Sequence, residues 1–191
     1  QRRREIGLRH VHVIHHGLDP ARYLCTPRPL GDYVCFVGRY AEVKGPHTAI
    51  DVARRAGVRI RMAGEVHVPD VAWAEAELRP RLAQAHVTDV GPVGSAVKAR
   101  LLAHARALIA PIEWNEPFGL ILIEAMLSGC PVVAFGMGSV PELVEDGLTG
   151  YIATSADHMV ELLQPGGAVD RIDRVACRAR AVERFSAERM V

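Results

Sequence analysis

Residues 113–126 read Glu-Trp-Asn-Glu-Pro-Phe-Gly-Leu-Ile-Leu-Ile-Glu-Ala-Met, and the rest of the sequence is best interpreted outward from them. Two glutamates, Glu116 and Glu124, stand on either side of a Pro-Phe-Gly turn that opens an apolar helix. Pro117 suits a helix entrance and Gly119 permits close backbone approach, so first-turn N–H groups can face a phosphate. Ionised glutamates would repel phosphate but accept hydrogen bonds from the vicinal hydroxyls of a sugar or ribose. Phosphate and diols together indicate a nucleotide sugar.

The composition is typical of one globular domain. Hydrophobic residues make up 49% of 191 residues, which is enough to bury most of the unfolded surface. The net charge of +1 provides no field for nucleic acid or for an anionic membrane. Apolar runs such as 120–123 and 131–135 are far shorter than a membrane span, and no signal segment is recognisable. The sequence therefore predicts a cytoplasmic protein that does not bind nucleic acid.

Cysteine and histidine spacing gives no sign of a metal site. The cysteines at positions 25, 35, 130 and 177 lack C-x-x-C spacing, so they are predicted to be free thiols. No histidine pair stands at helical i, i+4 spacing with the further ligands that zinc requires. We therefore expect neither a metal nor a cofactor.

Short β-rich runs alternate with helical patterns along the chain. The expected strands are 33–38, 58–63, 87–90, 107–112, 131–135 and 150–153, and the expected helices are 46–55, 69–84, 95–105, 118–128, 140–145 and 156–163. Continuous apolar strands between amphipathic helices predict an α/β domain with a doubly wound, Rossmann-like parallel sheet. Ligands of such sheets bind outside the carboxyl ends of the strands, so the loops at 38–39, 64–65 and 113–119 are expected to line one rim.

Helix punctuation agrees with this pattern. Pro46 is predicted to occupy the first turn of its helix, and Gly57 and Gly129 are predicted to end helices. Ser95 is expected to be the N-cap of the helix that follows it.

The spacing of Glu116 and Glu124, with seven residues between them in E-P-F-G-L-x-x-x-E-A-M, resembles that of retaining GT-B glycosyltransferases, family four in particular. Segments 13–19, 36–39 with 44–45, 63–65, and 138–142 followed by 145–147 resemble the same family in the same order, and the resemblance extends over roughly residues 11–163. It implies the C-terminal, donor-binding half of a GT-B enzyme. Such an enzyme would move a hexose from a nucleoside diphosphate sugar to an acceptor hydroxyl, with retention and without an essential metal. UDP-glucose is the first expected donor and GDP-mannose the second.

The resemblance also implies how the chain is divided. Residues 1–19 would comprise the end of a missing N-terminal domain and the interdomain linker, with a helical segment at the start. Residues 20–170 would bind the nucleotide sugar, and residues 171–191 would form one amphipathic helix that stops without a cap and crosses back to the missing domain. That domain would bind the acceptor, which is a glycan, lipid or small molecule. It would also make any peripheral membrane contact. The isolated chain is therefore expected to be inactive.

Arg39 and Lys44 flank a loop between a predicted strand and the helix that Pro46 begins. An arginine fork and a lysine point charge on one rim suit a diphosphate, whose charge grows as the sugar–phosphate bond breaks. Two solvated loop cations would produce the same local pattern. The resemblance assigns both residues to the donor diphosphate and to catalysis.

For the glutamates, the resemblance implies separate roles. Glu116 would bind the transferred sugar together with the backbone of Phe118, Gly119 and Leu120, and would stabilise charge at the anomeric carbon; the alternative is a helix cap. Glu124 would accept the two ribose hydroxyls, whereas a simple favourable interaction with the helix dipole would contribute only about 0.3–1 kcal/mol.

Three further residues are assigned by resemblance alone. Gly17 corresponds to the cleft glycine whose backbone approaches the diphosphate, and Val93 belongs to the loop whose backbone holds the base. Gly64 is counted among the donor-binding residues, and Glu65 after it either faces the cleft or is a solvated loop carboxylate. The family often has Pro-Asn where this chain has His15-His16, so His16 either touches the donor or, as we favour, packs in the hinge.

Two rival functions remain open at this level. One is a glycogen, starch or sucrose synthase-like transferase, which shares the glutamate spacing and the Arg/Lys pair. The other is a non-catalytic sugar-nucleotide sensor or regulatory module, against which the intact Arg39, Lys44, Glu116 and Glu124 argue.

Overall fold

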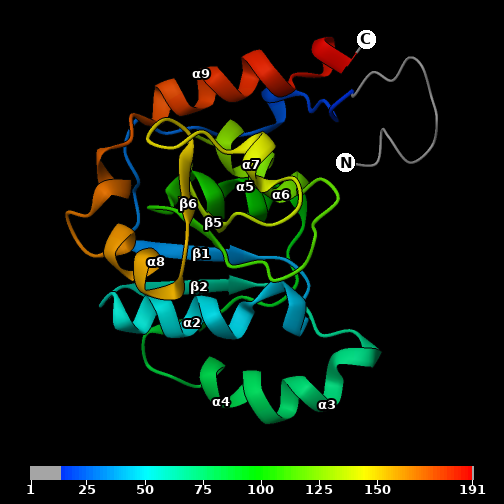
Figure 1. The fold of residues 1–191 in the computed structure, drawn as a ribbon, viewed down its shortest axis with the longest axis vertical. Helices are drawn as coiled ribbons and strands as arrows, with labels where there is room; N and C mark the ends of the chain where they lie inside the picture. Colours follow the sequence, from blue (N-terminus) through cyan, green and yellow to red (C-terminus); the bar gives the residue numbers. More distant parts are fainter. Residues whose placement is uncertain (1–13, 191) are drawn as a thin grey trace.

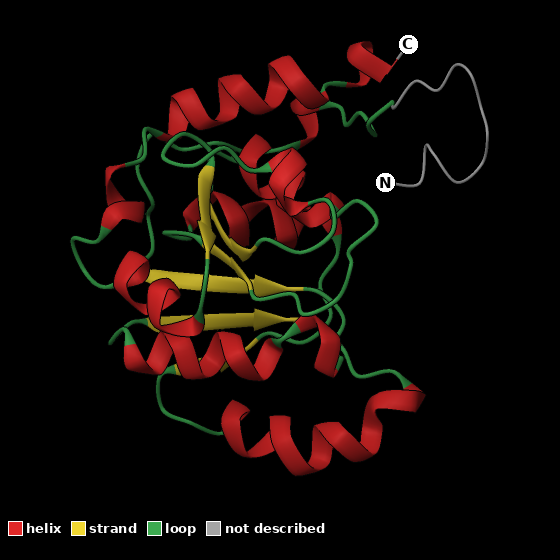
Figure 2. Ribbon diagram, viewed as in Figure 1, coloured by secondary structure: helices red, strands yellow, loops and turns green. Residues whose placement is uncertain are grey.

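The computed structural model describes residues 14–190. Six parallel strands form one sheet in the order β3-β2-β1-β4-β5-β6, covered by helices (Figure 1, Figure 2). The strands are β1 Tyr33–Val37, β2 Arg59–Ala63, β3 Val87–Asp89, β4 Leu108–Ala110, β5 Val132–Phe135 and β6 Gly150–Ala153. The predicted α/β class and doubly wound, Rossmann-like architecture are therefore confirmed. The helical segment expected at residues 1–4, and most of the expected linker, lie outside the described residues.

Helices cover both faces of the sheet, which explains why the central strands β1, β4 and β5 are apolar on both sides. Figure 1 shows α2 and α8 on one side, and α5, α6 and α9 on the other. Within β1, Val34 and Phe36 pack into the first of these layers, and Tyr33 and Cys35 into the second. The bounds of these helices are α2 Pro46–Arg55, α5 Ser95–His104, α6 Leu120–Leu127, α8 Ala156–Leu163 and α9 Arg174–Phe185.

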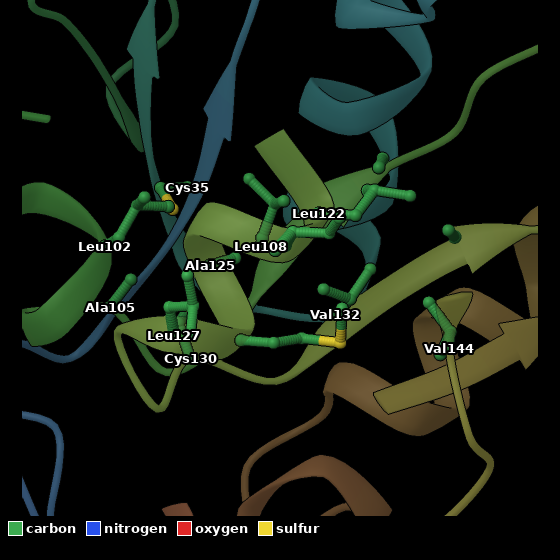
Figure 3. Close-up of a cluster of buried hydrophobic side chains, with 14 of the residues drawn as sticks. Cys35, Leu102, Ala105, Leu108, Leu122, Ala125, Leu127, Cys130, Val132 and Val144 are labelled. Atoms are coloured by element: carbon green, nitrogen blue, oxygen red, sulfur yellow. The ribbon is translucent and has the colours of Figure 1, made fainter. Parts of the chain in front are cut away.

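The core around α6 is built from small and branched apolar side chains, shown close up in Figure 3. Leu122 and Ala125 of α6 are fully buried with Leu108 of β4 and Val132 of β5 in this cluster. All four cysteines are free thiols, and burial raises the pKa of the Cys177 thiol to about 12. This packing holds α6 rigidly against the sheet, and with it the loop that precedes the helix.

Most helix ends follow the local signals. Pro46 is the first residue of α2, and Gly57 and Gly129, at φ 70° and 65°, follow the ends of α2 and α6, as predicted. The prediction for Ser95 is wrong. Gly94 holds the cap position of α5 without a side-chain hydrogen bond, and Ser95 is already the first helical residue.

The C-terminal region differs in its bounds from the prediction of one helix over 171–191 that stops without a cap, because α9 covers only Arg174–Phe185. Asp173 caps α9 through hydrogen bonds from the amides of Val175 and Ala176 to its Oδ1. The helix ends at Phe185 because the next residues pair with the N-terminal segment: the Leu18 amide donates to Phe185 O at 2.9 Å, and the Ala187 amide donates to Leu18 O at 3.0 Å. A short 3₁₀-helix, Ala187–Met190, follows.

The remaining elements are short. They are η1 Pro20–Arg22, η2 Glu42–Lys44, η3 Val68–Asp70, α3 Val71–Trp73, the π-helical turn η4 Ala74–Leu78, α4 Arg79–Leu82, α7 Val140–Leu143 and η5 Ala168–Arg171. None of the helices within residues 14–190 is long and apolar enough to cross a membrane.

Candidate active site at the carboxyl edge of the sheet

A pocket of about 460 Å³ opens beyond the carboxyl ends of β1 and β4. After β1 the chain continues to β2, and after β4 it continues to β5 on the opposite side. The two connecting loops therefore diverge and leave a crevice between them. The volume lies within the range of roughly 300–1,000 Å³ that is usual for small-molecule sites. The fold therefore places its candidate site at the topological switch point of the sheet.

The pocket brings together six of the predicted site residues. They are Arg39, Lys44, Glu116, Phe118, Gly119 and Leu120. The expected common rim is thus confirmed for the loops after β1 and β4. The third loop lies against the loop after β1, where the Tyr40 amide donates to Glu65 O at 2.8 Å, but Gly64 and Glu65 line a neighbouring pocket of about 330 Å³.

The loop after β1 is fixed by a close approach to the segment after β4. Gly45 has φ 70°, and a Cβ atom there would lie 2.2 Å from the carbonyl oxygen of Pro111. The amide of Glu113 donates to Val43 O at 2.9 Å, which ties the two segments together next to Lys44. This docking directs Lys44 to the β4 side of the crevice.

Lys44, Glu116 and Trp114 form a triangle at the pocket. Lys44 Nζ pairs with Glu116 Oε2, and the Trp114 indole N–H donates to the same oxygen at 2.9 Å. Lys44 Nζ also lies 4.7 Å from the centroid of the Trp114 ring, within cation–π range. Because the Glu116 side chain is only 12% exposed, water screens this pair less than it would a surface pair. The sequence analysis did not identify Trp114.

Glycine and serine contacts hold the loop that precedes α6. Gly119, at φ 83°, is the residue before the helix, so the prediction that Pro117 forms the helix entrance is wrong. The Ser139 hydroxyl donates to Phe118 O at 2.6 Å, and the Ser139 amide donates to Glu116 O at 3.0 Å. Glu116 therefore does not cap α6, whose first-turn N–H groups lie at the pocket.

Glu124 lies in the second turn of α6, and it is not among the residues that line the 460 Å³ pocket. Its Oε1 accepts from Lys98 Nζ at 2.7 Å and from the Tyr23 hydroxyl at 3.2 Å. Burial, reinforced by the Glu124 charge and hydrogen bond, raises the pKa of Tyr23 to about 12, so this phenol remains a donor at neutral pH. Sequence reasoning missed Tyr23 and Lys98, since neither belongs to a recognisable motif.

Arg39 is the least constrained cation of the pocket. Its side chain is 43% exposed, and its Nε lies 3.8 Å from Asp70 Oδ2. It can therefore turn toward an anion at small cost. Within residues 14–190, no group of three or more His, Cys, Asp or Glu side chains could hold a metal ion.

The structure places Gly17, Gly64 and Val93 outside the 460 Å³ pocket. A Cβ on Gly17 would lie 2.6 Å from Ser186 O, so this glycine permits contact with the segment after α9. A Cβ on Gly64 would lie 1.9 Å from Gly38 O, which makes Gly64 a spacer between the loops after β1 and β2. Val93 is half-buried against the core around α6.

His16 was predicted either to touch the donor or, as favoured, to pack in the hinge. It lines the pocket, and its ring packs edge-on against Phe118 with centroids 4.7 Å apart. The packing against Phe118 is observed, whereas the hinge position and the contact with the donor stay predictions.

Comparison with known proteins identifies similar chains. The family model described as glycosyl transferases group 1 matches residues 30–164. A D-inositol 3-phosphate glycosyltransferase of Mycobacterium marinum is 32% identical over 160 residues, which are 77% of this chain and 34% of the relative. The chain thus spans about a third of the length of the curated relatives it matches.

Two solved structures illustrate the likeness in fold. AviGT4, a glycosyltransferase involved in avilamycin A biosynthesis, is 27% identical with a TM-score of 0.76, covering 96% of this chain and 56% of its own. HepE of Anabaena, solved with UDP and glucose, is 23% identical with a TM-score of 0.76, covering 94% of this chain and 54% of its own.

Proposed function

Because the chain belongs to the glycosyl transferases group 1 family, we propose that it binds the nucleotide-sugar donor of a hexosyl transfer reaction. Its fold is the Rossmann-like half of a GT-B glycosyltransferase. The proposed reaction moves a hexose from a nucleoside diphosphate sugar to an acceptor hydroxyl, with retention of configuration and no essential metal. The observation that supports it most is the convergence of Arg39, Lys44 and the first turn of α6 on one pocket beside Glu116.

The diphosphate is proposed to bind between Arg39, Lys44 and the N–H groups at the start of α6. Those groups are fixed donors, and the partial positive charge of a helix N-terminus favours an anion. Lys44 would exchange its carboxylate partner for the phosphate, because the leaving diphosphate gains charge as the glycosidic bond breaks. Arg39, only loosely held by Asp70, would turn in to complete the clamp.

This exchange also prepares Glu116 for the sugar. Once Lys44 turns to the phosphate, Glu116 Oε2 keeps the hydrogen bond from Trp114, and the carboxylate can accept hydrogen bonds from hexose hydroxyls. The same carboxylate would stabilise positive charge at the anomeric carbon. Backbone groups of residues 118–120 would complete the sugar site.

Glu124 is proposed to accept the ribose hydroxyls, and the backbone near Val93 to hold the base. UDP-glucose is our first donor and GDP-mannose the second; the complex of HepE with UDP and glucose supports this order. The acceptor, a glycan, lipid or small molecule, is proposed to bind through an N-terminal domain of a longer enzyme, which would close the cleft over the donor.

Donor binding is expected to be independent of divalent metal. In calorimetric titrations of the 191-residue chain with UDP-, GDP- and ADP-sugars, affinity should be the same with and without excess EDTA. The reason is that Arg39 and Lys44 supply the positive charge that a metal supplies elsewhere. Loss of all binding in EDTA, restored by Mn²⁺ or Mg²⁺, would contradict the proposed metal-free site.

The two glutamates should differ in the ligand they affect. Glu124→Ala is expected to weaken UDP and UDP-glucose alike, by roughly 10- to 150-fold, because charged hydrogen bonds contribute about 1.5–3 kcal/mol. Glu116→Ala is expected to weaken UDP-glucose but to leave UDP unchanged or tighter, because Lys44 loses its competing partner. Calorimetry with both ligands measures the split. Glu161→Ala, an exposed glutamate of α8, serves as the control, and equal losses of both ligands in Glu116→Ala would reverse our assignment.

A further inference from the structure

Only two of the 23 basic side chains, Lys44 and Lys98, are lysines. Each pairs with one of the two glutamates that flank the Pro-Phe-Gly turn. Lys44 pairs with Glu116, and Lys98 pairs with Glu124. All other ion pairs to lysine or arginine in residues 14–190 use arginine. A lysine presents a compact point charge that can approach one carboxylate oxygen and leave the other uncovered, whereas an arginine fork tends to cover both.

The hydrogen bonds of Glu124 have this one-sided arrangement. Lys98 Nζ at 2.7 Å and the Tyr23 hydroxyl at 3.2 Å both donate to Oε1. Within the described residues, both hydrogen bonds end on Oε1. Oε2 is therefore the oxygen that remains to accept a hydrogen bond from a ligand. The Glu124 side chain is 14% exposed, which limits the directions in which Oε2 can point.

Both donors are themselves held in place. Lys98 precedes Leu102 by four residues on α5, so the two share a helix face, and Leu102 is fully buried in the core around α6. Tyr23 packs against the same core, and its carbonyl accepts from Arg178 Nη1 of α9 at 2.8 Å. The carboxylate is thus oriented from two sides by elements that do not belong to its own helix.

We propose that Lys98 and Tyr23 are positioning residues that lock Glu124 with Oε2 free to accept ribose hydroxyls, and that they thereby set a preference for ribonucleotide over 2′-deoxyribonucleotide donors. The inference rests on the proposed function, in which Glu124 binds the ribose. A glutamate that is ordered before the ligand arrives does not lose its side-chain entropy on binding. Without the hydrogen bonds from Lys98 and Tyr23, the Glu124 carboxylate would have to be ordered by the ribose itself.

The test compares UDP with 2′-deoxy-UDP, and the GDP and ADP pairs in the same way, by calorimetry on the 191-residue chain. The wild-type chain should prefer the ribonucleotide about tenfold or more, as expected for hydrogen bonds to a charged acceptor. Lys98→Met should reduce this preference to about threefold or less, and should weaken the ribonucleotide more than the deoxynucleotide, because the deoxynucleotide keeps only its 3′-hydroxyl contact with Glu124. Lys98→Arg should retain part of it. Arg100→Met, an exposed cation on the same helix, should retain all of it.

Loss of affinity for both nucleotides by the same factor in Lys98→Met, or an unchanged ratio, would overturn the proposal, since a purely structural ion pair does not distinguish the two sugars. If Lys98→Met does not fold, as judged by its thermal midpoint, Tyr23→Phe decides the question, because it removes one donor and no charge. A wild-type chain that binds none of the diphosphates would contradict the proposed function and this inference together. Binding without a ribose preference would contradict this inference alone and leave the diphosphate site standing.

Discussion

Replacing Lys44 by methionine is expected to slow sugar transfer about 10²–10³-fold, the usual effect of removing one preorganised donor from a developing oxyanion. The expectation applies to an enzyme that joins this chain to its acceptor-binding domain. Lys44 is held at the pocket by the docked loop after β1, so its charge is in place before the leaving diphosphate develops. Product formation from UDP-glucose, followed by mass, measures the effect.

Arg100→Met provides the matched control, since it removes an exposed cation outside the pocket and should leave the rate unchanged. The 191-residue chain by itself is expected to bind the donor without transferring it. Transfer requires the acceptor oxygen and the anomeric carbon to be held roughly 3–3.5 Å apart in a cleft that excludes water. A rate within tenfold of wild type in Lys44→Met would contradict the role of this lysine. Efficient transfer by the chain alone would place the acceptor site within these 191 residues.

Gly45→Ala is expected to destabilise the fold by about 2–5 kcal/mol, from left-handed backbone strain and overpacking together. The added Cβ would lie 2.2 Å from Pro111 O, which is a backbone atom and cannot turn aside as a side chain can. Urea unfolding followed by circular dichroism gives the change in the free energy of unfolding. Because the loop must shift, donor affinity should fall as Lys44 moves away from the pocket.

Gly57→Ala is the matched control for backbone strain. Gly57 has the same φ of 70°, but a Cβ there meets nothing within 4 Å. Its cost should therefore be only the left-handed strain of about 1–2 kcal/mol. Equal losses of unfolding free energy in Gly45→Ala and Gly57→Ala would show that the close approach of Gly45 to Pro111 adds nothing to the cost of the substitution.

Most of the fold could be predicted because its signals are local. The runs that become β5 and β6 are largely apolar, the run that becomes β2 alternates arginine with buried apolar residues, and all three differ from the observed strands by at most one residue. Errors occur where tertiary contacts decide an end. Leu120 rather than a residue next to Pro117 begins α6, because the left-handed Gly119 stands between them as the residue before the helix.

The position of the candidate site could be predicted as far as the sheet topology could be predicted. Once a doubly wound parallel sheet is expected, the loops after its central strands must meet at the carboxyl edge, which brings Arg39 and Lys44 next to Glu116. Gly17 and Gly64 were assigned by resemblance, and in the structure each permits the close approach of two backbone segments, while their role in donor binding stays a prediction. A glycine that permits close packing and a glycine that approaches a ligand leave the same trace in a sequence.

By itself, the sequence determined the α/β class, the order of its elements and the chemical types at the site, because periodicity and turn residues act over a few positions. Only the tertiary structure decided which charges meet. Lys44 is 72 residues from Glu116, and Lys98 is 26 residues from Glu124. Their pairing depends on β1 lying next to β4 and on α5 packing beside α6. No local pattern encodes such distances, because the free energy that sets them comes from burying the whole sheet between its helices.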